Sequence, residues 1–314
     1  MLPAQSAKED MFSRLVPEFL MHIEIELGFA KETIVKYRDC LRQVEKILSD
    51  FIVTDFSKRE LMTVKAALLA RNLGANRQTG ILLVLKRFYR YLKGERSLAV
   101  LDPEEIRPPR RPRREVAYLT AEEVERFVSI IKISNHRGYS YVAGLRFRAL
   151  VETILGSAMR ISEVLSLNRN QIDFKQAQAT IIGKGRKERT VFFTERALFW
   201  IERYLDTRAD TCSALFVCQD GKARLKRTDV WRPFTKYRKL SGIDKKVTPH
   251  LLRHTAATQL LFNGCPVGHI KEILGHERLE TTCRYYLGLD HRAAQAAHRK
   301  YLTYSAPAAS SSQP

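Results

Sequence analysis

The chain has 314 residues, an apolar fraction of 45% and a formal net charge of +20. This length allows one large or two modest hydrophobic cores, and the apolar fraction is that of a globular protein rather than a disordered one. A charge this positive is unusual for an ordinary soluble enzyme and indicates a polyanionic partner, with nucleic acid as the first candidate and an anionic membrane surface as the second.

The sequence carries no signal for a membrane or for an oxidising compartment. No apolar run approaches the length of about 18 residues that a spanning helix needs, and the N-terminus lacks the apolar core of a signal peptide. The five cysteines are odd in number and scattered, and they form no Cys-x-x-Cys pair. We therefore expect a cytoplasmic protein with reduced thiols, without a zinc site or a membrane partner.

Four amphipathic helices are predicted in the first 96 residues. Apolar residues recur there at helical spacing between about 12 and 93. Ser57 and Glu60 form a capping box at the start of the third helix. Because proline is best tolerated in the first turn, Pro17 predicts that the first helix starts near that position. These helices indicate a separate N-terminal domain over residues 1–96.

The outer face of the fourth predicted helix is basic. Such a face is usually solvated surface, but in a chain this positive it can equally lie along the phosphates of a nucleic acid. The candidate contacts on this face are Arg77, Lys86, Arg87 and Arg90.

Residues 97–116 break the helical pattern and form the predicted interdomain linker. Their prolines hold the chain extended, at about 3 Å per residue, so that it can span two domains. Arginines alternate with these prolines, and phosphate contact and simple solubility are equally open explanations for them. The arginines that we consider as DNA contacts are Arg110, Arg111, Arg113 and Arg114.

Two features of the second domain, predicted over residues 117–288, carry charged groups at informative positions. Arg160 and Glu163 lie one helical turn apart in an otherwise apolar segment, as in a buried ion pair or an active site. Two β-rich runs, 179–182 and 190–193, flank a Gly-Lys-Gly-Arg-Lys-Glu-Arg loop. They predict a hairpin whose polar tip can reach a bound substrate.

The C-terminal part of this domain is the richest in chemistry. His250 and Arg253 lie one turn apart on a helix that Thr248-Pro249 would start, and a second helix ends at Gly275, directly before His276. A Tyr285-Tyr286 pair follows. Imidazoles, a guanidinium and a phenol suit reaction at a phosphodiester, and no carboxylate cluster for Mg²⁺ stands beside them. Core packing is the commoner role of a lone histidine or tyrosine, but the set as a whole favours a site.

This pattern resembles that of the tyrosine recombinase (phage integrase) family. The family motif H-x-L-R-H, followed by L-G-H and by a tyrosine nine residues further on, is matched at His250, Arg253, His276 and Tyr285. The interval selects Tyr285 over Tyr286. The match is specific because residue types and intervals agree together.

Two further motifs of the family occur earlier in the chain. Its G-L-R-x-S-E setting is matched at Arg160 and Glu163, with Ala158 in place of the usual glycine. Its hairpin G-K-G-x-K-E-R assigns the catalytic lysine to Lys184, with Lys187 as the competing candidate.

The resemblance implies a mainly α fold with a small β-sheet or hairpin in the C-terminal domain. It implies an N-terminal four-helix, SAM-like core-binding domain and an α+β catalytic domain. It also implies a helix over residues 289–302 that docks one protomer on another, with packing in cis on its own domain as the alternative. The low-complexity end of the sequence predicts a disordered tail over residues 303–314.

The resemblance further implies an Xer-like, two-domain site-specific DNA recombinase of a prokaryote, associated with the nucleoid when on DNA. It would act in integration, excision, resolution or transposition through a 3′-phosphotyrosyl intermediate, without metal, ATP or another cofactor. Its implied partners are double-stranded DNA with paired inverted-repeat half-sites and three further copies in a homo-tetramer, the protein being a monomer or dimer off DNA. A second recombinase or an accessory protein is also possible.

Each candidate residue takes one role from this resemblance. Tyr285 would be the nucleophile, and Arg160 and Arg253 would hold the non-bridging phosphate oxygens. Lys184 would donate a proton to the leaving 5′-oxygen, and His250 would carry the proton of the tyrosine. His276 would donate a hydrogen bond to the phosphate, and the Glu163 carboxylate would orient its neighbours.

Three other functions are compatible with parts of the sequence. A type IB topoisomerase would use the same chemistry to relax supercoils as a monomer. A non-catalytic DNA-binding regulator would have little use for every catalytic position at once. His250 and His254 also resemble half of a metal-hydrolase site, although the glutamate of H-E-x-x-H is missing.

Overall fold

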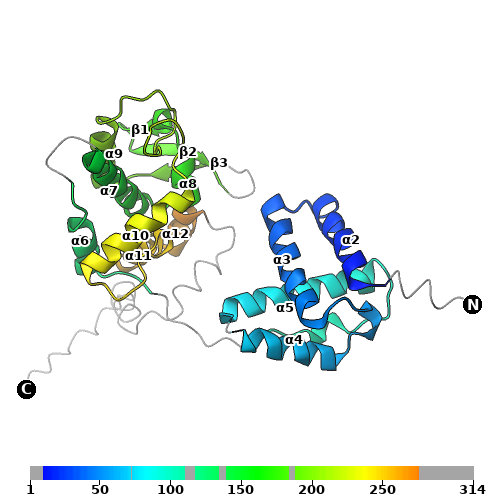
Figure 1. The fold of residues 1–314 in the computed structure, drawn as a ribbon. Coiled ribbons are helices and arrows are strands. Elements are labelled where there is room, and N and C mark those ends of the chain that lie inside the picture. Colours follow the sequence, from blue (N-terminus) through cyan, green and yellow to red (C-terminus); the bar gives the residue numbers. More distant parts are fainter. Residues whose placement is uncertain (1–9, 72, 110–116, 134–138, 184–187, 276–314) are drawn as a thin grey trace, which may run out of the picture. The chain divides into compact units, whose positions relative to one another are not determined.

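The computed structural model describes residues 10–71, 73–109, 117–133, 139–183 and 188–275 (Figure 1). The chain divides into two compact units, Met1–Arg113 and Arg114–Pro314, here called the N-terminal and C-terminal units. The division falls inside the segment predicted as the linker. None of the described helices is long and apolar enough to cross a membrane.

The described part of the N-terminal unit is helical, as predicted. Its α-helices are α2 (Phe12–Ile25), α3 (Lys31–Leu48), α4 (Lys58–Ala70) and α5 (Ala75–Gly94), and the short 3-10 turns are η1 (Val53–Asp55) and η2 (Pro103–Glu105). Their apolar stripes meet in one core around Leu15, Leu41 and Phe88, each fully buried.

The predicted start of the first helix was wrong. The helix α2 begins at Phe12, and Pro17 lies inside it. Proline in a helix interior leaves one carbonyl without its donor. Here Phe12 and Leu15, both on the N-terminal side of the proline, are fully buried in the core. Burial of two large side chains contributes about 3 to 6 kcal/mol, which offsets the lost hydrogen bond.

The beginning of the segment predicted as a linker packs against the N-terminal unit. Ile106 is fully buried in its core, and Leu98 and Leu101 lie against it. The acidic turn η2 lies over α5, where Glu104 pairs with two basic side chains of that helix. Residues 98–106 therefore belong to the N-terminal unit in their contacts.

The C-terminal unit combines helices with a small antiparallel sheet. Its elements are α6 (Ala121–Ser129), α7 (Tyr139–Ser157), α8 (Ile161–Ser166), η3 (Arg169–Gln171), β1 (Ile172–Asp173), β2 (Gln178–Ile182), β3 (Glu188–Phe192), α9 (Glu195–Leu205), α10 (Arg227–Ser241), α11 (Pro249–Phe262) and α12 (Val267–Leu274). The helix α7 packs against both α9 and α11. The predicted hairpin is confirmed as β2 and β3, and β1 adds a third strand beside β2.

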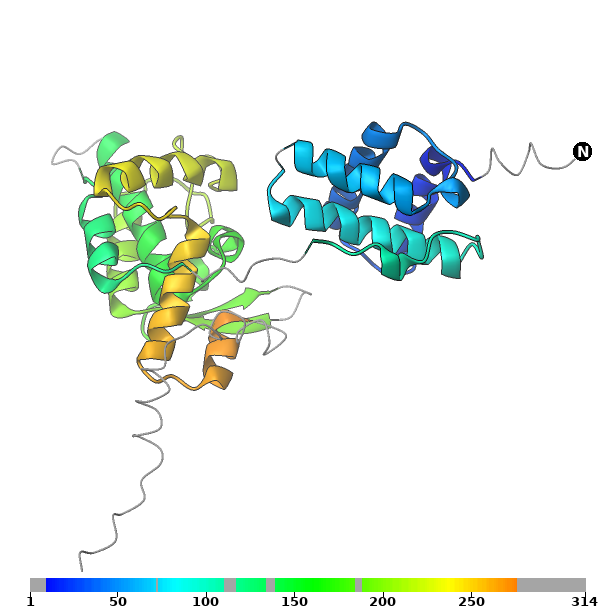
Figure 2. The same ribbon diagram turned by 90° about the horizontal axis from the view of Figure 1, so that it is seen from below.

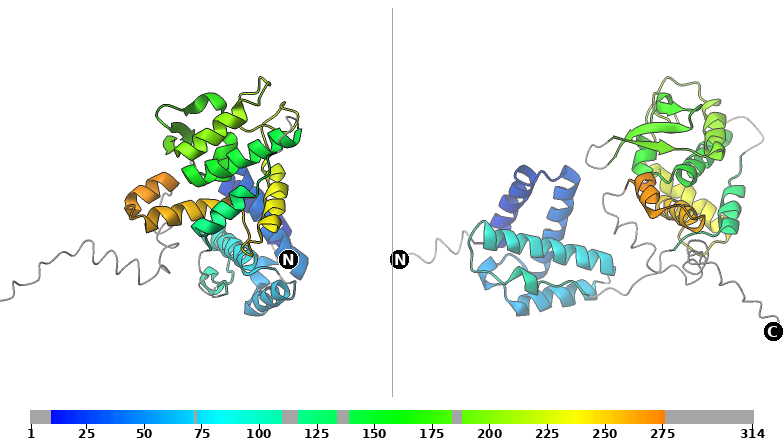
Figure 3. Two further views of the ribbon diagram at one scale, coloured as in Figure 1. Left: turned by 90° about the vertical axis from the view of Figure 1, so that its left-hand side faces the viewer. Right: turned by 180° about the vertical axis from the view of Figure 1, so that it is seen from behind.

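The last two helices are held in place by local signals and by a small apolar cluster. The Thr248 hydroxyl accepts a hydrogen bond from the Leu251 N–H, with Pro249 as the first helical residue, and Gly275 ends α12 with φ +58°. Ala256 of α11 and Leu274 of α12 pack with Ala158, at the turn before α8. The β2–β3 hairpin lies alongside α12 (Figures 2 and 3). The turn before α8, the β2–β3 hairpin and the helix pair α11–α12, which are far apart in sequence, thus lie close together.

Candidate active site

The turn before α8 has a backbone conformation that explains the glycine usual in this motif. Ala158 is buried and has φ +53°, in the left-handed region that L-residues rarely occupy. This conformation costs an alanine about 1 kcal/mol relative to glycine. It directs the Ala158 carbonyl to Arg253, whose Nη1 donates to it at 2.8 Å. The substitution of alanine for glycine therefore leaves the turn intact.

Glu163 is the centre of a cluster of charged side chains. Its Oε1 accepts from Nη1 of Arg160 at 2.8 Å, and its Oε2 accepts from the backbone N–H of Arg160 at 2.8 Å. Oε2 also accepts from Nη2 of Arg189 at 3.0 Å and lies 3.8 Å from Nη1 of Arg253. We call Arg160, Glu163, Arg189 and Arg253 the arginine–glutamate cluster.

The carboxylate of this cluster is ionised although it is 7% exposed. Burial acts to raise the pKa of Glu163, but the hydrogen bond from the Arg160 N–H and the charges of Arg189 and Arg160 outweigh it, so that the pKa lies below its ordinary value. One negative charge thus faces three guanidinium groups. The excess positive charge favours a bound anion.

The three arginines also hold the C-terminal end of α12. Arg189 donates from Nη1 to the Ile273 carbonyl at 2.8 Å, and Arg253 donates from Nη2 to the Leu274 carbonyl at 2.6 Å. Arg160 donates from Nη2 to the Gly275 carbonyl at 3.1 Å. These last carbonyls form the negative end of the helix dipole and have no intrahelical donor. Three consecutive carbonyls therefore each receive a guanidinium from a different element.

Exposure differs between the two arginines that the sequence placed in the site. The Arg160 side chain is 34% exposed, whereas that of Arg253 is 5% exposed. The Arg160 guanidinium is therefore accessible to solvent, whereas the Arg253 guanidinium is buried and acts through its positive charge. Preorganised cations of this kind stabilise charge that develops on an oxyanion.

His250 and His254 lie side by side on α11. Their Nε2 atoms are 2.8 Å apart, so one ring donates a hydrogen bond and the other accepts it. Two histidines on one zinc ion, at about 2.0 to 2.1 Å each, would hold their nitrogens more than about 3 Å apart in tetrahedral geometry. Within the described ranges, no group of three or more His, Cys, Asp or Glu side chains is placed to hold a metal. The pair is therefore hydrogen-bonded rather than arranged as metal ligands.

The surroundings of His250 favour its neutral form. Burial lowers the pKa of His250 below the ordinary 6.5, and the positive charges of Arg253 and Arg160 lower it further. A neutral imidazole can accept a proton at neutral pH.

Several predicted site residues cannot be placed. The nucleophile candidate Tyr285 and its neighbour Tyr286 lie outside the described residues, as do His276 and the two hairpin lysines Lys184 and Lys187. The same holds for the predicted linker contacts Arg110, Arg111, Arg113 and Arg114. The structure therefore brings together Arg160, Glu163, His250 and Arg253 of the predicted set.

The predicted contacts on α5 differ in what they touch within the N-terminal unit. Lys86 and Arg90 both pair with Glu104, each at 2.6 Å. Arg87 donates to the Tyr37 hydroxyl at 3.1 Å and stacks over the Phe29 ring. Arg77 is exposed near the start of the helix. Two of the four predicted contacts are thus already paired with one carboxylate of an acidic turn.

Sequence reasoning missed Arg189. The hairpin motif places this residue only in a polar loop, yet in β3 its side chain is 15% exposed and lies on the same side of the strand as the buried Val191. Period-two alternation counted back from Val191 would have placed an arginine on the inward face, where it needs a carboxylate partner.

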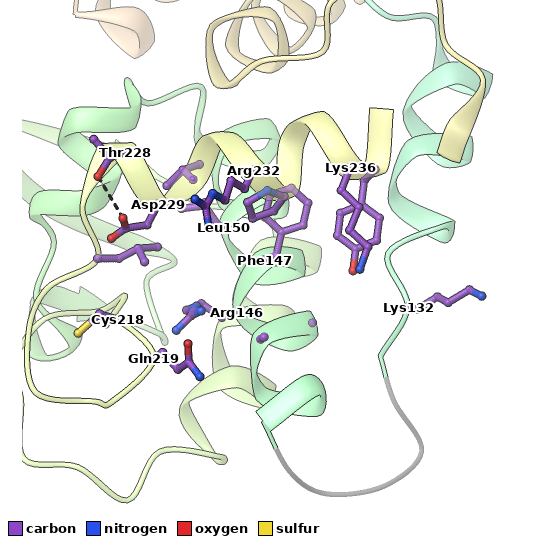
Figure 4. A pocket seen from close by; sticks show the side chains of 16 residues that line it. Lys132, Arg146, Phe147, Leu150, Cys218, Gln219, Thr228, Asp229, Arg232 and Lys236 are labelled. Atoms are coloured by element: carbon purple, nitrogen blue, oxygen red, sulfur yellow. Dashed lines mark hydrogen bonds between the residues drawn. The ribbon is translucent and has the colours of Figure 1, made fainter. Parts of the chain in front are cut away.

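A large hollow of the C-terminal unit lies apart from this cluster. It measures about 1080 Å³ and lies between the N-terminal part of α7 and α10, with Lys132, Arg146, Arg232 and Lys236 among its lining residues (Figure 4). None of the arginine–glutamate cluster lines it. The size of a cavity therefore does not indicate the site here, and the convergence of charged groups does.

Comparison with known proteins agrees with the motifs. Residues 117–292 match the Phage integrase family. The chain is 30% identical over 294 residues to the tyrosine recombinase XerD of Lacticaseibacillus casei, covering 91% of this chain and 97% of that protein. It is 33% identical over 251 residues to the tyrosine recombinase XerC of Chlamydia caviae, covering 78% of each. Its fold is similar to that of the Tn1549 transposon integrase, residues 82–397, with a TM-score of 0.75, 18% identity and coverage of 93% and 100%.

Proposed function

This chain belongs to the phage integrase family and is a tyrosine-type site-specific recombinase that acts on DNA, and we propose that it works through Tyr285 as an Xer-like enzyme. In this proposal Tyr285 attacks the scissile phosphate, forms a 3′-phosphotyrosyl link and releases a 5′-hydroxyl that later attacks the partner strand. The bond energy of the phosphodiester stays in the covalent intermediate, so the reaction needs no ATP.

The observation that carries this proposal is the convergence of Arg160 and Arg253. They come from different elements and share the carboxylate of Glu163 at 2.8 and 3.8 Å. The buried carboxylate of Glu152 faces two guanidinium groups, whereas that of Glu163 faces three. The surplus charge next to a partly exposed Arg160 is suited to the non-bridging oxygens of a phosphate in the transition state.

His250 would carry the proton of the attacking tyrosine. Its lowered pKa keeps the imidazole neutral near pH 7, which is the form that accepts a proton. Lys184 would protonate the leaving 5′-oxygen, and His276 would donate to a phosphate oxygen. The position of His276 directly after Gly275, whose carbonyl Arg160 holds, supports that role.

The proposed substrate is duplex DNA with paired inverted-repeat half-sites. The net charge of +20 supports contact with many phosphates. The Tn1549 integrase is known in complex with transposon right end DNA. From the family resemblance we propose a homo-tetramer on two sites, docked through residues 289–302, and a monomer or dimer off DNA.

The test is a covalent-trapping experiment. Binding sites are first selected from duplexes with randomised inverted repeats, and a nick is then placed so that the released fragment diffuses away after cleavage. The wild-type protein should form a covalent adduct in excess EDTA. Failure to form an adduct on selected DNA, or formation only with an added divalent ion, would contradict the proposal.

A relaxation assay separates recombination from topoisomerase activity. A supercoiled plasmid without the selected sites should stay supercoiled, whereas a plasmid with two sites should yield recombinants. Efficient relaxation of the plasmid without sites would favour the type IB topoisomerase alternative.

A further inference from the structure

Arg189 joins three parts of the C-terminal unit that are distant in sequence. It is anchored on β3, its Nη2 donates to Glu163 of α8 at 3.0 Å, and its Nη1 donates to the Ile273 carbonyl of α12 at 2.8 Å. The two acceptors belong to different elements. Only a planar fork with two terminal nitrogens reaches both, because a lysine ammonium is a single point.

The fork is also fitted closely against the end of α12. A Cβ placed on Gly275 would lie 2.6 Å from Nε of Arg189 and 3.0 Å from its Cδ. Gly275 therefore serves two purposes, since its φ of +58° closes the helix and its missing side chain leaves room for the guanidinium. Within the described part of the chain, Arg189 Nε is buried without a hydrogen-bond partner. An orphaned buried donor costs free energy, which the ion pair with Glu163 and the hydrogen bond to the Ile273 carbonyl must offset.

The contacts of Arg189 bear on both arginines of the site. Oε2 of Glu163, which accepts from Arg189, also accepts from the Arg160 N–H and faces Nη1 of Arg253. The carbonyl held by Arg189 is followed by the carbonyls held by Arg253 and Arg160. A shift of Arg189 would therefore move the Glu163 carboxylate and the end of α12. Both of these contact the guanidinium groups of Arg160 and Arg253.

We propose that Arg189 is a positioning residue for DNA cleavage: it fixes Glu163 and the end of α12, and through them the orientation of Arg160 and Arg253. This rests on the proposed function, because it assumes that these two arginines hold the scissile phosphate. Arg189 itself does not touch the substrate. Displacement of a catalytic group by about 1 Å can slow a reaction about 100-fold.

The experiment compares Arg189→Met and Arg189→Lys with a matched control, Arg224→Met. Arg224 is likewise partly buried in the C-terminal unit: its Nη1 donates to the carbonyls of Leu165 and Leu167 at 2.8 and 2.7 Å and its Nη2 to Oδ1 of Asn168 at 2.6 Å, but it does not contact the cluster. All proteins are assayed for DNA affinity, for thermal unfolding, and for the single-turnover rate of adduct formation with the substrate saturated by protein.

We expect Arg189→Met to bind DNA within about threefold of wild type and to form adduct about 100-fold more slowly. Arg189→Lys should recover little of the rate, since it cannot reach both acceptors. Arg224→Met should lose thermal stability but keep the cleavage rate. In combination with Glu163→Gln, Arg189→Met should slow cleavage little further, because both changes act through one carboxylate.

Cleavage by Arg189→Met within threefold of wild type would overturn the inference, as would an equal loss in Arg224→Met. If Arg189→Met does not fold, the same criteria apply to Arg189→Lys, where recovery of the wild-type rate would overturn it. Failure of the wild-type protein to form any adduct would contradict the proposed function instead, so the two failures are distinguishable.

Discussion

Replacement of Glu163 by glutamine should destabilise the C-terminal unit by about 3 kcal/mol. In either orientation of the amide, its NH₂ group meets a guanidinium donor, because Oε1 faces Arg160 and Oε2 faces Arg189. The change also leaves three clustered guanidinium groups without a counter-charge. Removal of one partner from a buried ion pair costs about 3 to 5 kcal/mol, and we take the lower value because glutamine keeps the volume and one acceptor.

Tryptophan fluorescence measures this change in the relevant unit. Both tryptophans of the chain, Trp200 and Trp231, lie in the C-terminal unit. A loss of about 3 kcal/mol corresponds to a fall in Tm of about 6 to 12 °C for a unit of this size. The matched control is Glu152→Gln, which alters a carboxylate buried between Arg148 and Arg196. It should lower Tm similarly but leave cleavage nearly unchanged.

The pH dependence of the stability difference between wild type and Glu163→Gln is a second, independent test of this prediction. Because the folded state lowers the pKa of Glu163 below its ordinary 4.5, the carboxylate stabilises the fold above that pH. This stabilisation is lost as pH falls through the folded-state pKa, and the glutamine variant never has it. The difference in Tm between the two proteins should therefore shrink below pH 4.5. A difference below about 1 kcal/mol at pH 7, or one that grows on acidification, would refute the reasoning.

Three further predictions concern separate parts of the chain. Ala158→Val should lower the stability of the C-terminal unit by about 2 kcal/mol in thermal unfolding, because a β-branched residue is strained at φ +53°; an unchanged Tm would contradict that backbone conformation. Glu104→Gln should raise DNA affinity at low salt and steepen its logarithmic salt dependence by about one to two units, by freeing Lys86 and Arg90 for phosphates; an unchanged slope would exclude these two as contacts. Burial and two arginines lower the pKa of His250, so the cleavage rate should fall on acidification only below pH 6.5. This decline should be absent in His250→Ala. A decline of the wild-type rate that begins above pH 7 would count against His250 as the proton acceptor.

Local signals in the sequence predicted the elements well. Hydroxyl caps such as Thr248 and the terminating Gly275 act within one helical turn. The residues next to a helix end therefore suffice to predict where the helix starts or stops. The confirmed hairpin follows from its β-rich runs for the same reason. Pro17 misled because the burial of Phe12 and Leu15 is a tertiary effect, which local preference does not include.

The site was only partly predictable, because its decisive contacts are long-range. The three-residue spacing between Arg160, the residue before α8, and Glu163 in its first turn predicted their proximity, and the motifs indicated His250 and Arg253. Nothing local indicates that Arg189 shares the same carboxylate, since that contact depends on how β3 packs against α12. The pairing of Glu104 with α5 was missed for a similar reason, because the chain folds back after the helix.

Identification of the residue that becomes attached to DNA tests the central claim most directly. The adduct trapped on a nicked site is digested with protease and nuclease, and the nucleotide-bearing peptide is sequenced by mass spectrometry in the wild type, Tyr285→Phe and Tyr286→Phe. Our account predicts attachment at Tyr285, loss of the adduct with retained DNA binding in Tyr285→Phe, and a normal adduct in Tyr286→Phe. Attachment at Tyr286, or an undiminished adduct in Tyr285→Phe, would contradict it.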